Sequence, residues 1–167
     1  MTKQISLEER ITRLEDIEEI KKLKAKYALF LDDGYDAEKI AGIFAEDGEW
    51  IIEDFVIKGQ TAIKEQCRKL VKAQPWSCHN ITPAVIEIDK DGRHAVGIFY
   101  VLAFLTMKND SGKDEAFFLP GIFKDKFVKI NGQWLFRKVE GLVRQAVPWT
   151  KGWVKGKNAK GFFNLKN

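Results

Sequence analysis

The sequence is poor in reactive side chains: its 167 residues include only two cysteines and two histidines. Cys67 and Cys78 have neither CxxC spacing nor a His/Cys cluster beside them, so we predict that both are reduced thiols. The sequence also lacks a phosphate-binding loop, a dinucleotide fingerprint and a metal-ligand cluster. It therefore predicts no cofactor and no metal, which leaves chemistry to the side chains of the chain itself.

Long hydrophobic runs are also missing. The longest, residues 95–107, is too short to cross a bilayer as a helix, which takes roughly 20 residues. The charged N-terminal segment lacks the continuous apolar stretch of a signal peptide. We therefore expect a cytoplasmic protein with no membrane partner. With 45% hydrophobic residues, a chain of this length can bury one core, which predicts a single domain over residues 1–167.

Acidic residues are absent from the end of the chain, residues 141–167, although the whole chain carries a formal charge of only +4. The basic residues of this region alternate with aromatic ones, a composition that some nucleic-acid-binding segments share. We favour a closing segment over residues 146–167, whose aromatic side chains pack on the core while its lysines stay in solvent. We expect no nucleic-acid partner. The aromatic residues concerned are Trp149, Trp153, Phe162 and Phe163.

The apolar pattern predicts helices first and strands afterwards. Apolar residues recur at steps of three and four from Leu7 to Phe30, which indicates one long amphipathic helix. Ser6 and Glu9 form a capping box at its start, and Gly34 is its stop. The remaining predictions are a helix over residues 36–44, a strand over 48–54, a helix directly after Gly59, and β-rich stretches over 77–89, 94–107, 115–130 and 134–144.

This order predicts an α+β domain, in which N-terminal helices pack on a curved, mainly antiparallel sheet that encloses a pocket. The stretch 95–107 is apolar at odd and even positions alike, so both faces of that part of the sheet need to be covered. Helices can cover one face only. A second subunit is the simplest cover for the other, which predicts a homodimer or homotrimer; the closing segment is the alternative.

The two histidines limit the choice of a general base. His94 follows a turn among charged residues and is interpreted as a solvated strand-start residue. His79 lies early in a strand with apolar neighbours, where it is either a hydrogen-bonded core residue or a base. Asp32 follows Phe30 and Leu31 as if it faced the interior, and a buried carboxylate needs a partner.

Imidazole is the obvious partner for Asp32. An aspartate that accepts from one ring N–H fixes the tautomer and raises the basicity of the other nitrogen. Asp32 and His79 are therefore a candidate dyad. The alternative is that Asp32 and Asp33 are an exposed pair at the end of the helix.

Further candidate site residues lie along the chain. Tyr27 precedes Asp32 by roughly one and a half helical turns. Arg144 either faces the pocket, where a guanidinium holds a carboxylate or an oxyanion, or is a surface cation. Aromatic residues that either line the pocket or belong to the plain core are Trp50, Phe55 and Trp76.

Four pieces of the sequence, in this order and spacing, resemble the SnoaL-like branch of the nuclear-transport-factor-2 superfamily. They are IEEIKKLKAKYALFLDDGYD, EDGEW followed by IKGQTAIKE, HNITPAVIEIDKDG, and INGQWLFRKVEGLVR. The resemblance covers residues from about 15 to about 145. It looks closest to the bile-acid 7α-dehydratases, and the chain is also similar to scytalone dehydratase and hexachlorocyclohexane dehydrochlorinase.

The resemblance implies a cone-shaped, cystatin-like fold and a cofactor-independent lyase or isomerase. In that family a helix-borne aspartate and a strand-borne histidine remove a proton, and by position Asp32 and His79 match them. Tyr27 matches an assisting tyrosine, and Arg144 an arginine close to the pocket. The acidic residue that the bile-acid enzymes carry on the long central strand has no counterpart here. The substrate implied is a hydrophobic, cyclic small molecule; the alternative is a non-catalytic ligand-binding or dimerisation module.

Overall fold

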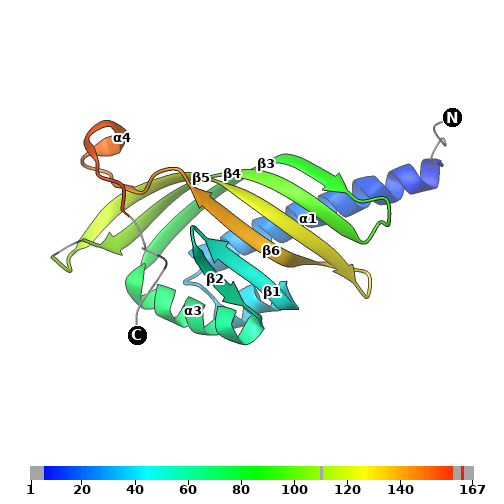
Figure 1. Ribbon diagram of the computed structural model, residues 1–167, viewed down its shortest axis with the longest axis horizontal. Helices are drawn as coiled ribbons and strands as arrows, with labels where there is room; N and C mark the ends of the chain where they lie inside the picture. Colours follow the sequence, from blue (N-terminus) through cyan, green and yellow to red (C-terminus); the bar gives the residue numbers. More distant parts are fainter. Residues whose placement is uncertain (1–5, 110, 160–162, 164–167) are drawn as a thin grey trace.

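The fold is given by a computed structural model that describes residues 6–109, 111–159 and 163 (Figure 1). Its helices are α1 (Leu7–Asp32), α2 (Ala37–Gly42), α3 (Gln60–Ala73) and the short α4 (Gly152–Lys155). At the start of α1 the Ser6 hydroxyl accepts from the backbone N–H of Glu9, and the Glu9 carboxylate accepts from that of Ser6. The predicted capping box is therefore confirmed.

The strands form a seven-stranded sheet in which β7 pairs with β5 beside the path β2-β1-β6-β5-β4-β3. Neighbouring strands are antiparallel, except that β1 runs parallel to β6. The predicted α+β fold with a curved, mainly antiparallel sheet is confirmed. The bounds of the strands are β1 Phe44–Ile52, β2 Phe55–Lys58, β3 Trp76–Ile88, β4 His94–Lys108, β5 Asp114–Ile130, β6 Gln133–Val143 and β7 Val147–Pro148.

Strand β2 is absent from the sequence-based prediction, and β1 begins earlier than predicted. The two strands form a tight hairpin in which Ile52 pairs with Phe55. Glu53, in the turn, has a φ of 54°, a left-handed conformation that turn glycines and asparagines usually supply. The local sequence therefore carries no ordinary hairpin signal.

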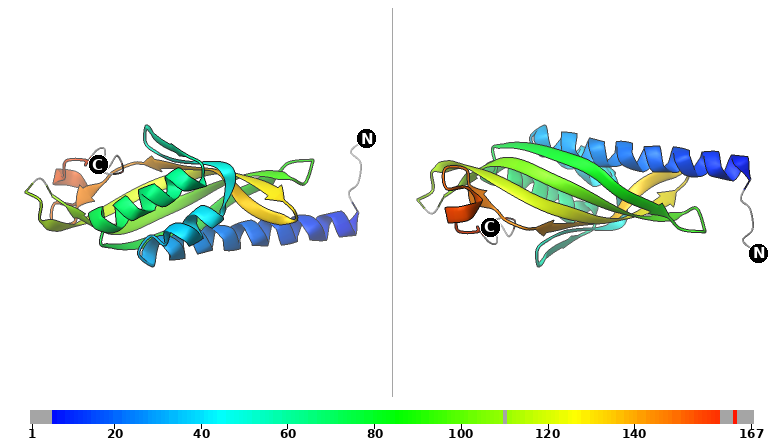
Figure 2. Two further views of the ribbon diagram at one scale, coloured as in Figure 1. Left: turned by 90° about the horizontal axis from the view of Figure 1, so that it is seen from below. Right: turned by 90° about the horizontal axis from the view of Figure 1, so that it is seen from above.

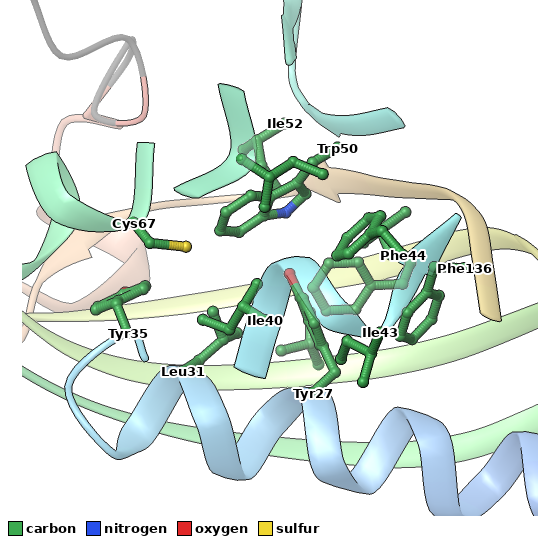
Figure 3. Packing of buried hydrophobic residues seen from close by; sticks show 14 of the residues in the cluster. Tyr27, Leu31, Tyr35, Ile40, Ile43, Phe44, Trp50, Ile52, Cys67 and Phe136 are labelled. Carbon is green, nitrogen blue, oxygen red and sulfur yellow. The ribbon is translucent and has the colours of Figure 1, made fainter. Parts of the chain in front are cut away.

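Helices α1 and α3 lie on one face of the sheet (Figure 2). The core between them and the sheet is rich in aromatic side chains. Tyr27 of α1 packs edge-on against Trp50, Phe123 and Phe136, with ring centroids 6.2, 5.9 and 5.6 Å apart (Figure 3). Such pairs contribute about 0.5–1.5 kcal/mol beyond the burial of their area. The long helix is thus fixed to three different strands through one residue.

The other face of the sheet is only partly covered. Strand β4 alternates between buried residues and exposed apolar ones, including Ile98 at 40% and Tyr100 at 52% exposure. At one end of this face Trp149 packs on Phe104 and Phe118, with ring centroids 6.0 and 6.4 Å apart. The C-terminal segment therefore covers that end, whereas Ile98 and Tyr100 stay open. Lys160, Phe162 and Lys166 of the same segment lie outside the described residues.

Candidate functional site

The site is built around a carboxylate and an imidazole that come from distant parts of the chain. Asp32 is the last residue of α1, and His79 lies near the start of β3. Asp32 Oδ1 is 2.6 Å from His79 Nδ1. Asp33, the next residue, points away with its side chain 74% exposed. The structure thus brings together the two residues of the candidate dyad.

Asp32 is held by three hydrogen bonds. Besides the ring nitrogen, the backbone N–H of His79 donates to Oδ2 at 2.8 Å and the Ser77 hydroxyl donates to Oδ1 at 3.0 Å. Partial burial alone would raise the pKa of the Asp32 carboxyl, but the bonds from His79 and Ser77 outweigh it and the pKa is lowered. The carboxylate is therefore charged and fixed in orientation.

Because a charged carboxylate only accepts hydrogen bonds, His79 Nδ1 carries a proton and Nε2 is left as the basic nitrogen. The His79 side chain is 11% exposed and forms part of the wall of an apolar pocket inside the cone. The contact with Asp32 thus orients the imidazole of a residue that lines the pocket. Geometry of this kind is what a general base requires.

The pocket lies between α1 and the inner face of the sheet, with an empty volume of about 530 Å³ that includes its open mouth. About 50 Å³ of this space admits the centre of a water-sized molecule, so side chains fill much of the cone. The residues that line it are mostly apolar. They include Leu31, Ile52, Val101, Leu105, Leu119 and Phe123.

Two hydrogen-bond donors lie in the same wall. The Tyr27 hydroxyl points from α1 toward the indole of Trp50 on β1 (Figure 3). Burial, followed by the nearby Asp125 carboxylate, holds the pKa of Tyr27 well above its usual value, so the hydroxyl stays protonated. The Trp50 Nε1–H is buried and has no hydrogen-bond partner of ordinary geometry among the described residues. The Tyr27 hydroxyl lies near enough to this N–H for the contact to oppose, in small part, the rise of the Tyr27 pKa.

Three other candidate residues lie away from the pocket. Arg144 follows the end of β6 and is exposed, with its guanidinium 5.9 Å from the centre of the Tyr100 ring on the outer face of the sheet. Trp76 is 57% exposed at the start of β3. Phe55 is half-buried and packs on Phe163, 6.1 Å away. None of the three lines the pocket, whereas Tyr27, Trp50 and His79 do.

A second polar end of the pocket was not predicted from the sequence. The Tyr35 hydroxyl donates to Gln74 Oε1 at 2.6 Å, and both residues line the pocket. Tyr35 has a φ of 54°, directly after Gly34 at 73°, and this turn carries its ring back under the sheet. The pair Gly34-Tyr35 at the end of α1 was the available signal, since a left-handed turn reverses the chain there.

Phe163 also lines the pocket and was missed as a pocket residue. Its ring centroid is 4.9 Å from that of Trp50, and its carbonyl accepts from Gln66 Nε2 at 2.8 Å. Phe163 therefore contacts both α3 and β1. No local pattern predicts a contact of this sequence separation.

One group of potential metal ligands occurs among the described residues. Asp89, Asp91 and His94 place their ligand atoms within 4.8 Å of one another, and all three are exposed. Asp91 also accepts from the backbone N–H groups of Arg93 and His94, which caps the β3–β4 turn. The group lies at the hairpin, and none of its members lines the pocket.

A model of the SnoaL-like domain matches residues 12–140, most of the chain. The chain belongs to the SnoaL-like family. The expected resemblance is therefore confirmed. No curated protein matches the chain significantly. None of the helices in the described part of the chain is long and apolar enough to span a membrane.

Several solved structures have the same fold. One is a protein of unknown function from Mycobacterium tuberculosis, 26% identical, with a TM-score of 0.66 over 80% of this chain and 74% of that one. Another, from Novosphingobium aromaticivorans, carries scytalone dehydratase as a provisional name; it is 23% identical, with a TM-score of 0.74 over 91% and 97%. A hexachlorocyclohexane dehydrochlorinase from Novosphingobium barchaimii is 19% identical, with a TM-score of 0.74 over 83% and 93%.

Proposed function

We propose that this SnoaL-like protein is a cofactor-independent lyase or isomerase that removes a proton beside a carbonyl group in a hydrophobic cyclic molecule. The observation that carries the proposal is the 2.6 Å contact between Asp32 and His79 at the wall of an apolar pocket. Family membership supports it, because named neighbours of this fold include a dehydrochlorinase. The roles of the residues follow from their positions.

His79 Nε2 is the base that takes the proton from carbon. The electron pair left behind moves toward the carbonyl oxygen, where Tyr27 and Trp50 donate hydrogen bonds to the developing negative charge. Asp32 stabilises the imidazolium that forms. In an isomerisation the proton returns to another carbon; in a dehydration it leaves with the departing hydroxyl group as water. No cofactor enters either balance.

The apolar lining defines the class of substrate. Aliphatic and aromatic side chains surround the dyad, and they gain more from a carbocyclic ring than from a sugar or a nucleotide. The free space is narrow, so a ring-sized substrate requires the pocket to widen as it binds. The polar part of the substrate that the pocket holds is the carbonyl, whose oxygen accepts from Tyr27 and Trp50.

The test is hydrogen exchange at carbon. In D₂O the wild-type protein should exchange the protons beside the carbonyl of 2-tetralone, a bicyclic ketone, faster than buffer does, as followed by NMR. Tyr27→Phe should lower the rate on the order of 10²-fold, because it removes an oxyanion donor, and Trp50→Phe should lower it by about tenfold or more. Phe55→Leu is the matched control, since Phe55 does not line the pocket. Equal rates in all variants would remove the donors from the mechanism.

The alternative is a pocket that binds its ligand without changing it. In that case Asp32 and His79 are a structural pair. The exchange assay separates the two functions, because a binding module would shift the NMR signals of the ketone and leave its protons in place.

We also propose that the open outer face of the sheet forms a homodimer or homotrimer interface. The exposed apolar residues there, Val96, Ile98, Tyr100 and Leu102, make a contiguous patch because alternate residues of β4 face the same side. Ile98→Glu should therefore reduce the mass measured by light scattering to that of one chain, because it places a charge in the interface. Val71→Glu changes an equally exposed residue of α3 and should leave the mass unchanged. A wild-type protein that is monomeric at micromolar concentration would contradict the proposal.

A further inference from the structure

A second, wider hollow has walls that include residues next to the β4–β5 hairpin and residues in and around α4. Figure 1 shows this hairpin and α4 at the same end of the molecule. The empty volume of the hollow, open mouth included, is about 1770 Å³, against about 530 Å³ for the apolar pocket. It lies between the C-terminal end of α3, the end of β4, the start of β5 and the segment that follows β7. The hollow is lined by four lysines, Lys108, Lys151, Lys155 and Lys157, and by one acidic residue, Glu115. We call this hollow the lysine groove.

Three of these lysines have no acidic partner. Lys108 pairs with Asp114 at 2.5 Å. Lys151, Lys155 and Lys157 form no ion pair among the described residues, and residues 141–167 contain no acidic side chain at all. Three uncompensated positive charges around one hollow make a site that favours anions.

The backbone that carries these lysines is tied to the sheet. The N–H of Trp149 donates to the Ala116 carbonyl at 2.7 Å, and that of Ala159 donates to the Ala146 carbonyl at 2.7 Å. Asn158 Oδ1 accepts from the Ala146 N–H at 2.5 Å. The backbone of these lysines is therefore fixed at the wall of the groove, and their side chains adjust to a ligand.

The groove adjoins the apolar pocket. Gln74, the residue after α3, lines both, and its Oε1 accepts the bond from Tyr35 at the polar end of the pocket. Gln74 thus stands between the apolar walls and His79 on one side and the lysines on the other. Aliphatic side chains prefer a ring, and ammonium groups prefer a carboxylate or a phosphate.

We infer that the substrate is amphiphilic: its ring system occupies the apolar pocket, and an anionic group on a short chain reaches past Gln74 into the lysine groove. The inference rests on the proposed function for the pocket, but not on catalysis. The anionic group anchors the substrate at a point remote from the reacting carbon. Binding energy from such an anchor positions the ring against His79 without taking part in the chemistry.

A pair of matched probes tests the inference by calorimetry. One is a naphthalene that carries a butanoate chain, and the other is its neutral butanamide. The carboxylate should bind about five- to tenfold more tightly at low salt, and the ratio should fall toward one as salt screens the lysines. The variant with Lys151→Gln, Lys155→Gln and Lys157→Gln should lose the preference and keep its affinity for the amide.

The control variant makes the same change in net charge elsewhere. Lys22, Lys26 and Lys90 are exposed, and none lines the groove. Changed together to glutamine, they should leave the preference intact. Equal affinity of the wild-type protein for both probes, or equal loss in both triple variants, would overturn the anionic anchor. If the wild-type protein prefers the carboxylate probe but does not exchange the protons of 2-tetralone, only the catalytic proposal is overturned.

Discussion

His79→Ala should lower the rate of proton exchange on 2-tetralone by at least about 10²–10⁴-fold, the usual contribution of a positioned base. Asp32→Asn should lower it by about 10²-fold or more, because the amide neither stabilises an imidazolium nor selects the tautomer with Nε2 free. The double variant should be little worse than His79→Ala alone. Residues that act as one unit lose their function together.

His94 is a matched control for this prediction. Its Nδ1 is 2.6 Å from Asp91 Oδ2, the same contact that His79 makes with Asp32, but it lies at an exposed turn. His94→Ala should leave the exchange rate unchanged. If His79→Ala retains nearly normal activity, or if His94→Ala is equally impaired, the dyad is not the base. Circular dichroism of each variant shows whether the fold is retained.

The parts of the fold that the sequence predicts have local causes. The start of α1 depends on Ser6 and Glu9, three residues apart, and its end depends on Gly34, whose φ is 73°. The strands β3 to β6 follow from β-rich stretches and the turn residues between them. Hairpin β1–β2 lacks such signals, because Glu53 adopts a left-handed conformation that its sequence does not favour.

The dyad could be predicted from the sequence because each of its two residues is unusual in its local sequence context. Asp32 is an acid after apolar residues, and His79 is one of only two histidines. Ser77 and the backbone N–H of His79, which complete the hydrogen bonding of Asp32, depend on how β3 lies against α1. The position of β3 against α1 depends on tertiary packing, so the residue spacing within either segment does not predict it.

Arg144 shows the same limit at the other end of the chain. Val143, at the end of β6, lines the pocket, and the next residue consequently turns to the opposite face of the sheet. The alternation of inward and outward residues along β6 could be predicted from the sequence. A bulge at Gly141 would reverse it, so the facing of Arg144 could not be predicted. In the fold a Cβ at Gly141 would lie 2.5 Å from Ile52 Cδ1, so this glycine allows close packing of β6 on β1.

The largest stability effect is expected from a pair that gave no signal in the sequence. Lys24 stands among other lysines in α1 and Asp125 among lysines in β5, where both would be expected in solvent. Instead their side chains are 2% and 0% exposed, and Lys24 Nζ is 2.7 Å from Asp125 Oδ2. Lys24 Nζ also lies 3.5 Å from the centre of the Phe123 ring and 4.6 Å from that of Tyr27.

Burial lowers the pKa of Lys24 and raises that of Asp125, and their mutual attraction opposes both shifts. Lys24→Met should therefore lower the free energy of unfolding by about 3–5 kcal/mol, because it leaves a carboxylate without its partner in an apolar core. Asp125→Leu should do the same for the ammonium group. The double variant Lys24→Met/Asp125→Leu should be more stable than either single one, because two apolar side chains of similar size then fill the space.

Urea unfolding followed by circular dichroism measures all three variants, and the cycle gives the coupling between the two residues. The exposed pair of Lys39 and Asp36, with nitrogen and oxygen 2.9 Å apart, is the control. Lys39→Met should cost less than about 1 kcal/mol, since solvent screens both charges. A small loss in Lys24→Met, equal to that of the control, would mean that water reaches the pair. Asp125 would then contribute less to the raised pKa of Tyr27, and burial of the hydroxyl would remain its main cause.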